Sequence, residues 1–403
     1  MKWWIVLLAL LVALTACGGG GNSGESARGN GDDDTGEPPV DDDADDDADD
    51  DTTPDDDTTP DDDTADDDTS PIPPGMIVDD QVAGYTDLKL DALGRPAIVY
   101  KGKNSGLRYA AWDGSAWAIE QVESSTQVGL YASLFLDADG QPHVAYHDAD
   151  ALTLNYAART ARGWDKVVVD DSAQVGQWCA IAQNGAGEIY ISYQDMQNGG
   201  LKVARYTTAW ENEVVEAGTE NGLFTSIAFD SSDTAYISYY DATAKSLKVA
   251  HGVFGAWTID AVDPAVGPSD DRGRWTSVAV DGADRVHVAY QDAAKLDLKY
   301  ARFESSAWTV ETVDALGDKG ADACIMTDAY NEPHIVYQDG SNLSLDYAYI
   351  DYLGHWQFSV LMNGHDYPGG FGFWLGCALR QSGPVVSHYY PHDSELLIYP
   401  AMQ

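Results

Sequence analysis

The chain contains 403 residues and carries a formal net charge of −45, from 67 acidic against 22 basic side chains. Residues 76–403 alone hold 44 acidic and 20 basic residues, a net charge of −24. Because no basic run or patch is visible, nucleic acids and anionic membrane surfaces are excluded as the expected binding partners.

Residues 1–16 are typical of an export signal. Lys2 precedes an apolar run of twelve residues, too short to span a bilayer. Small residues followed by Cys17 resemble a bacterial lipobox, so we expect cleavage before Cys17 and its diacylation. Gly18 favours the outer membrane, on its periplasmic or cell-surface face. The alternative is an ordinary signal peptide followed by a chance cysteine.

Residues 17–75 are predicted to be a lipid-anchored, disordered tether. Asp triplets alternate with Ala, Thr or Thr-Thr-Pro, and 23 acidic residues stand against Arg28 alone. Such a segment has almost no apolar surface to offset the entropy of ordering, and its charges repel one another. Calcium binding is the alternative, but a calcium site needs a loop that wraps oxygens around the ion.

One pattern recurs through residues 76–403: an apolar strand that ends in Tyr, usually followed by any residue and Asp. Seven copies occur at steps of 46 to 51 residues. The anchor positions are Tyr100, Tyr146, Tyr193, Tyr239, Tyr290, Tyr337 and His388. Such a regular internal repeat indicates that the domain is built from seven similar units.

Each copy is predicted to contain four short antiparallel strands. In the second copy these are residues 131–136, 143–147, 152–158 and 164–169, which show period-two alternation and are separated by Gly, Asp and Pro turns. Four strands in each repeat of about 47 residues predict an all-β fold, the seven-bladed β-propeller. The alternative is a six-bladed ring with a ragged seventh copy.

The ends of the repeat region predict how the ring closes. The last copy stops after its third strand, residues 396–399, without a fourth. Residues 76–80 (Met-Ile-Val-Asp-Asp) read like residues 167–171 (Val-Val-Val-Asp-Asp), the fourth strand of copy two. We therefore expect residues 76–80 to complete the seventh blade.

The three remaining cysteines, Cys179, Cys324 and Cys377, all fall in the first strand of a copy. Cys324 and Cys377 align with Ser133 and its equivalents. Our preferred interpretation is three small core residues near the crowded axis. A disulfide between Cys324 and Cys377 is the alternative in an exported protein, and the odd number leaves at least one free thiol.

A ligand is expected at the face where the first strands begin, because two sets of loops meet there. Most first strands begin with a bulky side chain, and Asp322 interrupts the series. The predicted ring consists of Tyr85, Tyr131, Trp178, Phe224, Trp275 and either Trp374 or Leu375. Aromatic platforms flanked by hydrogen-bonding groups suit sugars.

Residues present in every blade are interpreted as framework. The anchor Tyr is expected to pack, and the Asp two residues later to cap the next loop by accepting backbone N–H bonds. His143, His287 and His334 share one repeat position and are also expected to be framework, as is the Trp that opens the fourth strands.

Function is expected where the blades differ. The loop before blade five carries Arg272 and Arg274, and the longest loop, before blade seven, carries His365. In blade seven the anchor is replaced by His388 and Tyr389. With the aromatic ring, these five residues complete the predicted ligand site. The alternative is that longer loops are simply tolerated on a surface.

Residues 76–403 resemble the sialidase-like group of β-propellers related to Asp-box repeats, including bacterial lipoproteins that carry such repeats. They are also similar to seven-bladed propeller lectins, which have an Asp-Gly-x-x-Trp feature like residues 113–117. The resemblance implies the propeller fold and carbohydrate recognition. Sialidase activity is not carried over, since the Ser-x-Asp-x-Gly-x-x-Trp box and the Phe/Tyr-Arg-Ile-Pro motif do not occur.

Three functions remain open. The first is a non-catalytic surface lipoprotein that binds a glycan or a surface protein. The second is a polysaccharide-cleaving lyase or glycosidase that uses His365, His388, Tyr389 and Arg272. The third is a structural envelope component. We expect a monomer that requires no cofactor, no metal ion and no nucleic acid, and that meets the membrane through its lipid anchor alone.

Overall fold

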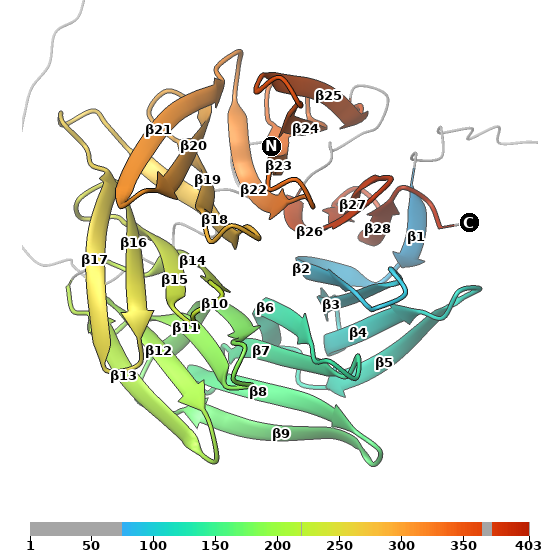
Figure 1. The fold of residues 1–403 in the computed structure, drawn as a ribbon. Helices are drawn as coiled ribbons and strands as arrows, with labels where there is room; N and C mark the ends of the chain where they lie inside the picture. The colour runs from blue at the N-terminus through green and yellow to red at the C-terminus, as the bar shows by residue number, and fades with distance from the viewer. Residues whose placement is uncertain (1–74, 219, 365–372, 403) are drawn as a thin grey trace, which may run out of the picture. The chain divides into compact units, whose positions relative to one another are not determined.

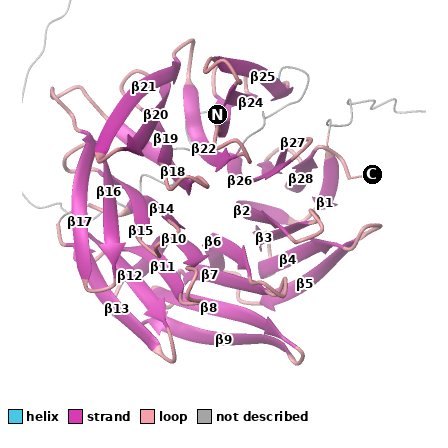
Figure 2. Cartoon of the chain, in the orientation of Figure 1, coloured by secondary structure: helices cyan, strands magenta, loops and turns pink. Residues whose placement is uncertain are grey.

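The computed structural model describes residues 75–218, 220–364 and 373–402. These residues form 28 strands in seven four-stranded antiparallel sheets, which stand as blades around a common axis (Figure 1). Strands and connecting loops account for the whole of the described chain (Figure 2). It contains no helix that is long and apolar enough to cross a membrane. The predicted seven-bladed β-propeller is confirmed.

Successive blades follow one another in chain order, each running outward from the axis. Blades one and two contain β2 (Val82–Leu90), β3 (Pro96–Gly102), β4 (Gly106–Trp112), β5 (Trp117–Glu123), β6 (Val128–Leu136), β7 (Pro142–Asp148), β8 (Thr153–Thr160) and β9 (Gly163–Asp170). Blades three and four contain β10 (Val175–Gln183), β11 (Ile189–Asp195), β12 (Gly200–Tyr206), β13 (Trp210–Glu216), β14 (Leu223–Phe229), β15 (Ala235–Asp241), β16 (Ser246–Val253) and β17 (Ala256–Asp263).

The remaining blades repeat this plan, and the last takes its outer strand from the start of the domain. Blades five and six contain β18 (Arg272–Val280), β19 (Val286–Asp292), β20 (Asp297–Glu304), β21 (Ala307–Asp314), β22 (Lys319–Thr327), β23 (Pro333–Asp339), β24 (Ser344–Ile350) and β25 (Trp356–Met362). Blade seven contains β26 (Phe373–Arg380), β27 (Gly383–Tyr390), β28 (Glu395–Tyr399) and β1 (Met76–Asp79).

The ring closes as the sequence predicts. β1 pairs antiparallel with β28, with Met76 opposite Ile398 and Ile77 opposite Leu397. Val78 is buried in a cluster that joins blade seven to blade one. Six other apolar clusters fill the remaining interfaces between neighbouring blades. Both faces of every sheet are therefore covered, which removes the exposure that isolated four-stranded sheets would have.

Five of the anchor tyrosines connect their blade to the one before it. The hydroxyl of Tyr193 donates to Asp170 Oδ2 at 2.6 Å, and Lys202 forms an ion pair with the same carboxylate. The arrangement recurs as Tyr100 with Asp79 and Arg108, Tyr239 with Glu216 and Lys248, Tyr290 with Asp263 and Lys299, and Tyr337 with Asp314 and Lys319. The expected framework role of these tyrosines is confirmed.

The other repeated polar residues are framework as well. Asp148 Oδ1 accepts the backbone N–H groups of Asp150 and Ala151, which caps the loop after β7. His287 is fully buried between Tyr300 and Asp281, at 2.6 and 3.0 Å. These side chains are held by their own blades, so they are not available to a ligand.

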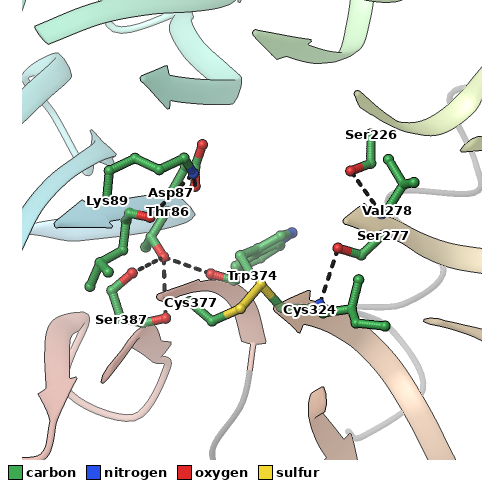
Figure 3. Close-up of a disulfide and its surroundings, with 12 residues drawn as sticks. Thr86, Asp87, Lys89, Ser226, Ser277, Val278, Cys324, Trp374, Cys377 and Ser387 are labelled. Carbon is green, nitrogen blue, oxygen red and sulfur yellow. Dashed lines mark hydrogen bonds and ion pairs between the residues drawn. A yellow bond between two sulfur atoms is a disulfide. The ribbon is translucent and has the colours of Figure 1, made fainter. Parts of the chain in front are cut away.

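The disulfide occupies the place of a repeated contact between inner strands. Elsewhere a serine hydroxyl accepts a backbone N–H of the next blade: Ser133 from Ile181, Ser226 from Val278 and Ser277 from Ile325. Between blades six and seven, a Cys324–Cys377 disulfide takes over this link, with the two Cα atoms 6.2 Å apart (Figure 3).

Our preference for three small core cysteines is therefore wrong for Cys324 and Cys377, whereas Cys179 is a buried free thiol. The alignment is also corrected by one residue. Gly376, not Cys377, lies opposite Ser387, so Cys377 stands where other blades place the N–H donor of this contact. A cross-link over a separation of 53 residues stabilises the fold by about 4 kcal/mol.

Candidate functional site

Every inner strand contains a β-bulge near its beginning. In β6, Leu130 lies opposite His147 and Ser133 opposite Ala145, so one extra residue is accommodated on β6. The first bulged residue has a left-handed backbone, with φ between 48° and 55°, in all seven blades. These residues are Tyr85, Tyr131, Trp178, Phe224, Trp275, Asp322 and Trp374, and we call them the axial ring.

The left-handed conformation costs a residue with a side chain about 1 kcal/mol. Its effect is to turn the side chain out of the regular alternation of the strand. A glycine with positive φ lies two residues before the ring member in five blades, and Gly84 lies one residue before Tyr85. These glycines give the chain the freedom to enter the bulge. Seven repetitions of a strained geometry at one place indicate a site.

The aromatic members of the axial ring contact one another in an arc. From Trp374 through Tyr85, Tyr131, Trp178 and Phe224 to Trp275, successive ring centroids are 4.9, 5.0, 4.5, 4.2 and 4.6 Å apart. Asp322 takes the place between Trp275 and Trp374. The arc and the residues that follow it line a pocket of about 170 Å³ at the axis. The second layer is Thr86, Ala132, Cys179, Thr225, Thr276, Ala323 and Leu375.

Polar groups of this second layer fix the ring members from below. Thr86 Oγ1 donates to the backbone carbonyl of Trp374 at 2.8 Å, as the close-up shows (Figure 3). Cys179 Sγ donates to the carbonyl of Tyr131 at 2.9 Å, and Thr225 donates to that of Trp178. Each of these blades thereby holds the ring member of its predecessor.

The residue between Tyr and Asp of the anchor holds the ring from the side. The side chains of Lys101, His147 and Gln291 donate to main-chain carbonyls of the following blade, at 2.9, 3.0 and 2.9 Å. The accepting residue lies three positions before the next ring member. The aromatic arc is therefore positioned by its neighbours before any ligand arrives, which lowers the ordering entropy of binding.

Asp322 is the one acidic side chain that lines the pocket. Its Oδ2 accepts the backbone N–H of Trp374 at 3.2 Å. No Lys, Arg or His in the described parts of the chain forms an ion pair with it. Removal from water raises the pKa of Asp322 to about 7, although the hydrogen bond from Trp374 acts in the opposite direction.

The two tyrosines of the axial ring are linked to each other and to this charge. Burial raises the pKa of Tyr85, with the nearby charge of Asp322 as a smaller cause, while a hydrogen bond between the hydroxyls of Tyr85 and Tyr131 opposes the shift. Both phenols are therefore neutral donors and acceptors at physiological pH. The pocket thus offers π faces, two hydroxyls and one carboxylate.

Arg272 and Arg274, which the sequence placed in the site, do not line this pocket. Arg272 is largely buried, with ion pairs to Asp263 at 2.9 Å and to Asp270 at 3.1 Å. Arg274 pairs with Asp271 at 2.7 Å. Both guanidinium groups hold the loop before blade five, so neither is directed at the axis as the sequence analysis expected.

His388 and Tyr389 of blade seven, which the sequence analysis assigned to the site, do not line the pocket either. Tyr389 is half-buried, its ring lies 5.5 Å from that of Trp374, and it packs against the cluster between blades seven and one without lining the pocket. His388 is fully buried, and burial lowers its pKa to about 4. His365 and Cys17 lie outside the described residues. In the described chain, no cluster of three or more His, Cys, Asp or Glu is arranged to hold a metal ion.

No protein-family model matches the sequence, and no curated protein matches it. Solved structures do. The polysaccharide lyase Uly1 matches with a TM-score of 0.55 and 8% identity, over 80% of this chain and 97% of the lyase. The fold is that of a β-propeller. At such identity the likeness shows the fold alone.

Two further structures match with a TM-score of 0.50. The SapL1 lectin, solved with alpha methyl fucoside, is 11% identical over 70% of this chain and 97% of its own. A mutant of AofleA from Arthrobotrys oligospora is 14% identical over 70% of this chain and 87% of its own. These likenesses agree with the propeller that the sequence repeat predicts.

Sequence reasoning found the aromatic members of the axial ring but not its strained geometry or the second layer. A signal was present: Gly129, Gly176, Gly222, Gly273 and Gly320 each stand two residues before a ring member. In the sequence analysis Asp322 interrupts the series of bulky residues, whereas the structure places it in the pocket wall. Its equivalent position, not its residue type, identifies it as a member.

Proposed function

We propose that this chain is an exported lipoprotein whose propeller binds a glycan without cleaving it. The observation that carries the proposal is the axial ring. Six aromatic side chains in one preorganised arc present π faces, on which the C–H faces of sugars stack. The hydroxyls of Tyr85 and Tyr131 and the carboxylate of Asp322 supply hydrogen bonds. Ligand pockets typically combine a mostly apolar lining with a few polar groups that orient the ligand, and this pocket has that composition.

The catalytic alternative receives less support. A general base must reach the proton that it removes. His388 is fully buried, and Arg272 is engaged by framework carboxylates. Tyr389 contacts the ring of Trp374 but does not line the pocket. We therefore keep glycan binding, which the lectin SapL1 illustrates on a related fold, as the function of the axial site.

Replacement of Trp275 by Ala is expected to weaken glycan binding at least about tenfold, equivalent to about 1.4 kcal/mol. The indole supplies part of the stacking surface, and its ring centroid lies 4.6 Å from that of Phe224. Trp275→Phe should recover part of the affinity, because an aromatic face returns. The measurement is a glycan-array screen of the full chain, followed by titration calorimetry with the best ligand.

Tyr352→Ala is the matched control, since Tyr352 is 92% exposed in the hairpin between β24 and β25. Its affinity should equal that of the parent. Equal binding by Trp275→Ala and the parent would remove the axial ring from the ligand site. An array without any bound glycan would overturn the proposed function itself.

For the N-terminal segment we propose a lipid anchor at Cys17 in the outer membrane, followed by a tether to the propeller. The apolar run, the small residues before Cys17 and the acidic composition of residues 18–75 support this. Expression with a labelled fatty acid tests it: label is expected in the parent chain and not in Cys17→Ser. Equal labelling of both would refute the anchor.

A further inference from the structure

The pocket at the axis has an unbalanced electrostatic composition. Fourteen residues line it, and none of them is Lys, Arg or His. Asp322 is the only one whose side chain ionises near neutral pH. Six of the others present aromatic rings, whose faces carry partial negative charge. Every strong electrostatic feature of the lining therefore attracts positive charge.

The protein itself shows what such a combination binds. In three interfaces between blades, a lysine ammonium lies near a carboxylate and an anchor Tyr ring. Lys202, Lys299 and Lys319 stand 5.6, 5.6 and 5.9 Å from the centroids of Tyr193, Tyr290 and Tyr337. Each ammonium also pairs with an acidic side chain. The axial pocket repeats the carboxylate and the rings but contains no ammonium of its own.

The other classes of ligand fit less well. An anionic sugar would bring a second negative charge beside Asp322, with no cation in the lining to pair it. Beside a neutral sugar the carboxyl of Asp322 has no cation to pair with, so its ionisation stays unfavourable. A cation instead stabilises the ionised carboxylate, and the net charge of −24 over residues 76–403 attracts it from solution.

The volume limits the size of the bound group. A cavity of about 170 Å³ is smaller than the roughly 300–1,000 Å³ typical of pockets that enclose drug-sized ligands. Only a small terminal group enters, such as one sugar ring or one alkylammonium head. The remainder of a larger ligand would lie across the loops of the face.

We propose that the axial pocket takes a positively charged ammonium group, held between Asp322 and the aromatic arc and borne by an amino sugar at the end of a glycan. The assignment of the carrier as a sugar rests on the proposed function; the charge of the bound group rests on the lining alone. Ligands with a free amine are therefore selected over their N-acetylated and uncharged counterparts.

The test is titration calorimetry of the full chain at pH 7 with glucosamine, N-acetylglucosamine, glucose, glucuronic acid and tetramethylammonium. Glucosamine is expected to bind at least tenfold more tightly than the two neutral sugars and the acid. Tetramethylammonium is expected to compete with it. In Asp322→Asn the preference for glucosamine should fall below threefold, since the amide keeps the shape and the acceptor for Trp374 N–H but removes the charge.

Asp150→Asn is the matched control, because Asp150 is exposed on a loop between second and third strands and its replacement changes the net charge equally. It should retain the preference. Tight binding of a neutral or acidic sugar that depends on Trp275 would overturn this inference and leave the proposed function standing. Binding of tetramethylammonium through Asp322, with no sugar bound, would support the inference and refute the function. Absence of all binding would refute both.

Discussion

Deletion of residues 76–79 is expected to remove more than about 5 kcal/mol of stability, a large part of what a domain normally has. The deletion takes away the outer strand of blade seven, so β28 becomes an open edge. It also removes the buried side chain of Val78 from the cluster between blades seven and one. The ring would lose the contact that joins its two ends.

The same deletion disturbs blade one. Asp79 accepts the hydroxyl of Tyr100 and pairs with Arg108. Without this carboxylate, a largely buried guanidinium and a buried phenol are left without their partner, and breaking one such pair costs about 3–5 kcal/mol. Thermal unfolding followed by circular dichroism measures the effect. We expect a fall in Tm of more than about 7 °C for a domain of this size.

A chain that lacks residues 61–64 instead is the control for shortening, because these precede the first described strand, and its Tm should match the parent. Asp79→Asn separates the two contributions, since it keeps the strand pairing and removes the charge. A Tm of the 76–79 deletion within about 2 °C of the parent would show that β1 does not close the ring.

Asp322→Asn is expected to stabilise the protein at pH 8 by up to about 4 kcal/mol and to leave it unchanged near pH 4. Burial raises the pKa of Asp322 from 3.8 to about 7. One unit of pKa corresponds to about 1.36 kcal/mol between the two protonation states. The neutral amide of the variant avoids the unfavourable ionisation and still accepts the N–H of Trp374.

The direction follows from proton binding. Between about pH 4 and pH 7, the folded state retains a proton on Asp322 that the unfolded state has released. Stability of the parent therefore falls as the pH rises through this window, and the loss is complete above about pH 7. The variant lacks this contribution, so its advantage grows with pH across the same range.

Chemical denaturation at several pH values between 4 and 8 measures the difference between Asp322→Asn and the parent. Asp150→Asn, which removes an equal charge from an exposed loop, is the control for the change in net charge. A constant difference for Asp322→Asn across the range would mean that the carboxyl is not shifted. A stabilising substitution that also removes ligand selectivity would identify Asp322 as a residue retained for binding.

The fold was predictable because the repeat is local. The Tyr anchors are spaced by 46 to 51 residues, and the similarity of residues 76–80 to 167–171 predicted the closing strand correctly. The aspartates of the two segments also correspond. Asp79 accepts the hydroxyl of Tyr100, just as Asp170 accepts the hydroxyl of Tyr193. Alternation within strands is a property of the chain alone, and seven copies make it unambiguous.

The site was predictable in part. The aromatic ring members share one repeat position, so the sequence brings them together. The partners of Arg272, Asp263 and Asp270, are close to it in the sequence, but no sequence pattern shows that the loop turns the guanidinium onto them and away from the axis. The burial of His388 depends on how blade seven packs against its neighbours.

The sequence analysis gives the disulfide only as the alternative, because small residues near the crowded axis account for the same cysteines. Its alignment also puts Cys377 in the slot that the structure gives to Gly376.

The bulges have an evolutionary consequence. Since the backbone turn, and not the identity of the side chain, aims each ring member at the axis, single substitutions at these positions can exchange what the pocket presents while strand register is preserved. In this chain, six blades present an aromatic residue at the ring position and one presents an aspartate. A homologue with a different residue at position 85, 178 or 275 is expected to bind a different ligand with the same fold.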